Sequence, residues 1–122
     1  MTKNYKERDI YKRSIVFAVE VSCLVDALPN KISTRAIGQQ LIRSATSISA
    51  NIAEGSAGVS KKDFINFMAI SRKSAVETEH WLNFLKELDL LEKDKLVDEC
   101  VEIIKILTTI INKTKVNGNL SM

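Results

Sequence analysis

Long stretches without a helix-breaking residue are the feature that most limits how this chain can fold. The only proline is Pro29, and just four glycines interrupt segments rich in Ala, Leu, Ile, Lys and Glu. Proline and glycine both destabilise helix interiors, so their scarcity favours helix over sheet. The 122 residues are 45% hydrophobic, which is enough for one core. We therefore predict an all-α fold with a single domain spanning residues 1–122.

Apolar residues recur three and four positions apart in four segments of the chain. Pro29 separates the first two segments, Gly55 and Gly58 supply a stop and a turn after the second, and Ser60 can cap the third. Four helices joined by short connections pack most economically as an antiparallel up-down-up-down four-helix bundle. The predicted helices cover about residues 9–28, 34–56, 61–90 and 94–115.

The first predicted helix is apolar on two sides. One side carries the regular core stripe, and the opposite side carries Val16, Val19 and Cys23. Because a small bundle covers only one side of a helix, the second side predicts contact with another subunit. Scattered surface valines are the alternative interpretation of the same three residues.

The stretch Gln40–Gly55 combines small residues with a polar stripe at helical spacing. If the second and third helices are antiparallel, Arg43 lies level with Ser74 and Glu77, which predicts an ion pair between Arg43 and Glu77. Asn51 is then expected to bond the third helix. Three roles stay open for this network: fixing helix register, binding, and catalysis. Its residues are Gln40, Arg43, Ser47, Asn51, Glu54, Ser74 and Glu77.

Catalytic and metal-binding patterns are incomplete in this sequence. Glu77 and His80 have the Glu-x-x-His spacing of di-iron bundles, but His80 is the only histidine and such sites need two of these motifs. Cys23 and Cys100 stand far apart without a CxxC pair, so we expect reduced packing residues rather than a disulfide or a zinc site. We predict no catalytic residue, no metal and no cofactor, and hence no enzyme.

The net charge of +3 is unevenly distributed along the chain. Residues 1–53 contain eight Lys and Arg against four Asp and Glu. Groups of basic side chains at the start of the first and third predicted helices either bind phosphates or form an ordinary solvated face. No signal peptide or membrane span is evident, so we expect a cytoplasmic protein with no membrane partner. The candidate nucleic-acid-binding residues are Lys3, Lys6, Arg8, Lys12, Arg13, Lys61, Lys62, Arg72 and Lys73.

The stretch QLIRSATSISANIAEG, followed by F-x-x-F-x-x-I, Ser74 and E-x-E, resembles the four-helix-bundle family of 23S ribosomal RNA intervening-sequence proteins. The resemblance covers about residues 8–110. Ser44 and Ser71 stand where that family usually has alanine, and Lys73 replaces a common glycine, where it is expected to crowd a close helix contact.

The resemblance also implies an assembly and partners. The family is similar to the accessory variability proteins of diversity-generating retroelements, which form pentameric barrels and bind nucleic acid and a reverse transcriptase. It therefore implies a homo-oligomer, a pentamer, that binds RNA or another nucleic acid through a basic surface. The alternative is a scaffold that recruits a protein partner, such as a reverse transcriptase, without touching nucleic acid.

Overall fold

The computed structural model of this chain describes residues 5–58, 60–92 and 94–120, with side chains described for residues 9–58, 60–92 and 94–116. Within these residues there are four helices and no strand, which confirms the all-α prediction. None of these helices is long and apolar enough to cross a membrane. The helices are α1 (Tyr5–Asp26), α2 (Ile32–Ser56), α3 (Lys61–Glu87) and α4 (Lys95–Leu120).

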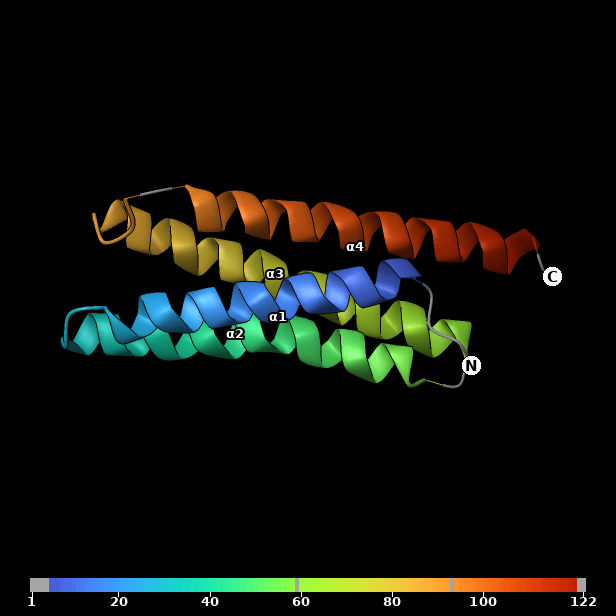
Figure 1. Ribbon diagram of the computed structural model, residues 1–122, viewed down its shortest axis with the longest axis horizontal. Coiled ribbons are helices and arrows are strands. Elements are labelled where there is room, and N and C mark those ends of the chain that lie inside the picture. Colours follow the sequence, from blue (N-terminus) through green and yellow to red (C-terminus); the bar gives the residue numbers. More distant parts are fainter. Residues whose placement is uncertain (1–4, 59, 93, 121–122) are drawn as a thin grey trace.

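The helices lie side by side in a bundle whose chain turns back at each connection (Figure 1). Each helix packs against the helices next to it in sequence, and α1 also contacts α4. The contact between α1 and α4 is the least extensive of these four. The start of α1, the connection between α2 and α3, and the end of α4 therefore share one end of the bundle (Figure 1).

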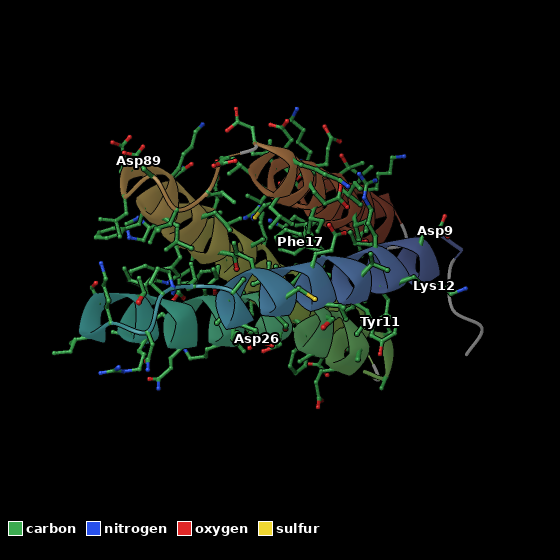
Figure 2. The ribbon with its side chains drawn as sticks, turned by 60° about the vertical axis from the view of Figure 1, so that its left-hand side comes forward. Asp9, Tyr11, Lys12, Phe17, Asp26 and Asp89 are labelled. Carbon is green, nitrogen blue, oxygen red and sulfur yellow. The ribbon has the colours of Figure 1, made fainter. Side chains whose placement is uncertain are left out.

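The core forms because each helix turns one apolar stripe inward. Phe17 of α1 points into the bundle, whereas Lys12 points outward (Figure 2). Leu41 of α2, Leu82 of α3 and Leu107 of α4 are fully buried. Burying a leucine side chain contributes about 1.5–3 kcal/mol, so these stripes supply the main driving force for the fold.

Two helix boundaries differ from the sequence prediction at the first connection. Helix α1 ends at Asp26 rather than residue 28, and α2 begins at Ile32 rather than residue 34. Thr34 lies within the first turn of α2, where its Oγ1 accepts a hydrogen bond from the Lys31 backbone N–H at 3.2 Å and donates to the Pro29 carbonyl. The hydroxyl that caps α2 therefore belongs to a residue of its first turn, so the helix begins before Thr34 and not at it.

The end of α3 also differs, because Asp89 takes over a position usually held by glycine. Asp89 has a positive φ of 58°, and the Leu90 N–H donates to the Leu85 carbonyl at 2.9 Å. This is a left-handed C-terminal cap, which aspartate tolerates better than most residues. Helix α3 thus ends at Glu87 instead of residue 90. Helix α4 continues to Leu120, beyond the predicted end at residue 115.

Gly55 has a different role from the expected one. It is buried inside the last turn of α2 and does not have positive φ. A Cβ atom at this position would lie 2.9 Å from the Cβ of Phe67 and 2.8 Å from the Cε of Met68. Glycine is required here because α2 and α3 approach closely, and not because the chain needs a flexible stop.

Candidate functional site

Buried hydroxyl groups join α2 to α3 along the centre of their contact. The Thr78 hydroxyl lies 2.9 Å from the Ser44 Oγ, and both residues are buried. The Ser71 hydroxyl donates to the Ile48 carbonyl at 2.8 Å. A hydrogen bond of this kind contributes about 1 kcal/mol net, so these pairings favour one register of α2 against α3. They also explain the serines that occupy positions 44 and 71.

A charged group lies at the outer margin of the same contact. The Arg43 guanidinium donates to Glu77 and also to the Gln40 Oε1, at 3.0 Å from Nη2. The Trp81 Nε1 donates to the same Glu77 carboxylate at 3.2 Å. The expected ion pair between Arg43 and Glu77 is therefore present. Because the two side chains are 56% and 36% exposed, their pairing contributes at most about 1 kcal/mol.

Ser47, Ser74 and Asn51 continue the polar contact toward the α2–α3 connection. The Ser74 hydroxyl donates to the Ser47 Oγ at 3.0 Å. Asn51 was expected to bond α3, but its Nδ2 donates to the carbonyl and hydroxyl of Ser47 in its own helix, at 2.8 and 2.9 Å. That expectation was wrong because a residue four positions away in a helix offers a nearer acceptor. Glu54 is exposed.

The reactive side chains of the described residues do not converge on one another. These residues contain no group of three or more His, Cys, Asp and Glu side chains placed to hold a metal ion. His80 is exposed and packs edge-on against Trp81, with ring centres 4.8 Å apart. Burial raises the pKa of the Cys100 thiol to about 12, and its Sγ lies 3.1 Å from the Ala75 carbonyl. Cys100 is therefore a neutral packing residue at physiological pH.

The basic residues singled out between positions 3 and 13 divide into three groups. Lys3 lies outside the described residues, and Lys6 and Arg8 lie in α1 where side chains are not described. Lys12 is exposed. Arg13 makes a two-pronged ion pair with Glu99 of α4, with nitrogen–oxygen distances of 2.7 and 2.8 Å. The hydrogen bond to Glu99 raises the pKa of Arg13. Arg13 therefore joins α1 to α4.

The basic residues singled out in α3 lie on its first half. Lys61, Lys62 and Lys73 are exposed, so Lys73 does not crowd the contact with a neighbouring helix as expected. Arg72 is half-buried, and its Nη1 donates weakly to the Thr108 Oγ1 at 3.5 Å. The structure brings the start of α3 to the same end of the bundle as the start of α1 (Figure 1). Residues about 50 positions apart in sequence thus share one end.

Between Arg13 and Asp26 the exposed residues of α1 carry no charge. Val16 and Val19 are each 57% exposed, and Cys23 is exposed as well. Tyr11 and Ile15 extend the same apolar surface, although sequence periodicity did not indicate Tyr11. Cys23 is thus not a packing residue within one chain. We call these five residues the outer strip of α1.

The fold and the polar α2–α3 contact define a four-helix-bundle protein. The sequence matches the family of 23S rRNA-intervening sequence proteins over residues 6–109. The chain belongs to this family, as the resemblance predicted.

A solved structure supports the same assignment. It is a protein of unknown function from the S23 ribosomal protein family of Bacteroides thetaiotaomicron, which is 34% identical in sequence. The TM-score is 0.81, and the match covers 88% of this chain and 98% of that chain. No curated protein matches the chain.

Proposed function

We propose that this chain is an antiparallel up-down-up-down four-helix bundle that assembles as a homo-oligomer, a pentamer, and binds RNA or another nucleic acid. It works in the cytoplasm and catalyses no reaction. Nucleic acid binds through the basic surface, while the polar contact between α2 and α3 holds each bundle in register.

One observation carries the nucleic-acid part of this proposal. Exposed lysines occur in two helix segments that share one end of the bundle (Figure 1): Lys12 in the first half of α1, and Lys61 and Lys62 at the start of α3. Cationic side chains bind phosphate backbones by releasing counterions. An oligomer would present several copies of this surface together and bind more tightly than one chain.

Filter binding of a labelled RNA at several salt concentrations tests this function directly. We expect retention at low salt that weakens steeply as salt rises, because binding depends on counterion release. If no labelled RNA is retained at low salt, the proposal is wrong.

The outer strip of α1 supports the homo-oligomer. Several exposed apolar residues on one helix of a small protein are typical of a contact with another chain. Replacing Val19 with Glu would place a charge inside that contact, so we expect smaller species by light scattering. Val116→Glu is the matched control, since Val116 is 55% exposed on α4, and it should leave the mass unchanged. An unchanged mass for both variants would count against this face.

A protein-interaction scaffold is the second candidate function. Val76 and Phe84 of α3 and Leu88 just after it are exposed and could receive a protein partner. Purification from native cells distinguishes the two functions. A stoichiometric protein partner without nucleic acid favours the scaffold, and co-purifying nucleic acid favours the first proposal.

A further inference from the structure

The second half of α4 is a basic segment that the motifs discussed above do not include. Between Ile103 and Val116 the helix has three lysines, Lys105, Lys113 and Lys115, and no acidic residue. The preceding segment, Asp94–Glu102, has four acidic residues and one lysine. Charge therefore changes sign along a single helix.

Helix α3 has the opposite order of charges. Its first half, Lys61–Ser74, has four basic residues and one acidic residue, Asp63. Its second half, Ala75–Glu87, has three acidic residues and one lysine. Because both helices change sign near their middle, the direction in which they pack decides whether the two basic halves meet.

Two contacts fix that direction. Arg72 reaches Thr108, and the Cys100 Sγ lies against the Ala75 carbonyl. As the residue number rises along α3 it falls along α4, so the two basic halves lie together. The same register brings the beginning of α3 level with the end of α4 (Figure 1). Lys61 and Lys115 consequently lie at the same level of the bundle.

We propose that the seam between residues 61–74 of α3 and residues 103–116 of α4, named here the basic seam, is the surface that contacts nucleic-acid phosphates. This inference rests on the proposed function and adds α4 to the binding surface. Lys62, Lys73 and Lys115 are exposed. Lys105 instead lines a pocket with Asp9 and Arg13 of α1, so it lies on the α1 side of α4 and not in this seam. Thr108 and Asn112 supply uncharged side chains between the lysines.

Charge elsewhere on the bundle restricts the approach of a polyanion. The first part of α4 faces Glu20 of α1, and a groove there is lined by four further carboxylates and one lysine: Asp94, Asp98, Glu99, Glu102 and Lys95. Carboxylates repel phosphates, so the acidic half of the bundle disfavours binding. In the α1–α4 seam, Glu99 already neutralises Arg13. Nucleic acid is therefore directed to the basic seam at one end of the molecule.

A pair of matched double variants tests the location. K62Q/K115Q neutralises two exposed lysines of the basic seam, one from each helix, and K31Q/K95Q neutralises two exposed lysines in the half of the bundle that carries the acidic segments. Both variants remove the same amount of charge from the full-length protein. Affinity for a labelled single-stranded RNA is measured by fluorescence anisotropy over a range of salt concentrations. Circular dichroism checks that both variants keep the wild-type helix content.

We expect K62Q/K115Q to lower the slope of log affinity against log salt by about 1.4, since each lost contact to a single strand removes about 0.7. At 0.1 M salt the affinity should fall roughly 25-fold by the same relation. K31Q/K95Q should retain the wild-type slope. Equal losses in the two variants, or no loss in K62Q/K115Q, would overturn the location while leaving nucleic-acid binding in place. If the wild-type protein does not bind RNA at all, both proposals fall.

Discussion

The hydroxyl pair of Ser44 and Thr78 offers the sharpest test of how α2 and α3 are held together. Both side chains are almost fully buried, with oxygens 2.9 Å apart. Each also has a partner in its own helix, since Thr78 reaches the Ser74 carbonyl at 2.8 Å and Ser44 reaches the Leu41 carbonyl at 3.2 Å. Removing one hydroxyl therefore breaks the link between helices without leaving the other group unpaired.

The expected cost follows from that arrangement. Thr78→Val keeps the shape of the side chain and loses one net hydrogen bond, which is about 1 kcal/mol. Ser44→Ala loses the same bond and should also cost about 1 kcal/mol. Because the two changes remove one shared interaction, the double variant should cost about 1 kcal/mol rather than about 2, which is a coupling of about 1 kcal/mol.

Urea unfolding followed by circular dichroism measures these differences. All variants are compared at one protein concentration, because the stability of an oligomer depends on concentration. Thr46→Val is the matched control, since Thr46 is exposed and its hydroxyl reaches only carbonyls of its own helix. It should change the free energy of unfolding by less than about 0.5 kcal/mol. Additive costs for Ser44→Ala and Thr78→Val would refute the reasoning.

Three further predictions address single features of the fold. Gly55→Ala should destabilise the protein by about 1 kcal/mol in urea unfolding, because the close approach of α3 outweighs the gain in helix propensity; a stabilised variant would contradict the close approach. In a Cys23→Ser background, Cys100 should not react with a thiol reagent at pH 8 until the protein unfolds, because its raised pKa, about 12, keeps the thiol protonated. Rapid reaction in the folded state would show that the thiol is accessible. Asp89→Gly should raise the midpoint of thermal unfolding, since glycine adopts positive φ without strain; a lowered midpoint would indicate an additional role for the Asp89 side chain.

Much of the helical organisation follows from local sequence patterns. The core side of α1 and the inner stripe of α4 are visible from residue spacing, because helix period and solvent exclusion act on each segment separately. The ion pair of Arg43 and Glu77 could also be predicted, since a short connection between α2 and α3 leaves few possible registers. The outer apolar side of α1 was visible for the same reason. We propose that another subunit of the oligomer covers this side.

Other features depend on atoms that are distant in sequence. Only the packed helices show that Gly55 is needed for a close contact, that Asn51 is satisfied within its own helix, and that Asp89 ends α3. Each outcome depends on which packing or hydrogen-bond partners lie nearby in the folded protein. Residue spacing along the chain does not give that information.

The distribution of charge shows most clearly the difference between what the sequence determines and what the folded structure determines. The sequence by itself determined how many lysines each helix has and on which half of that helix they lie. Whether the positive potentials of Lys61 and Lys115 add together depends on the direction and register of α3 against α4. The contacts of Arg72 and Cys100 establish both. Electrostatic fields add in space and not along the chain, so the basic seam exists only in the folded bundle.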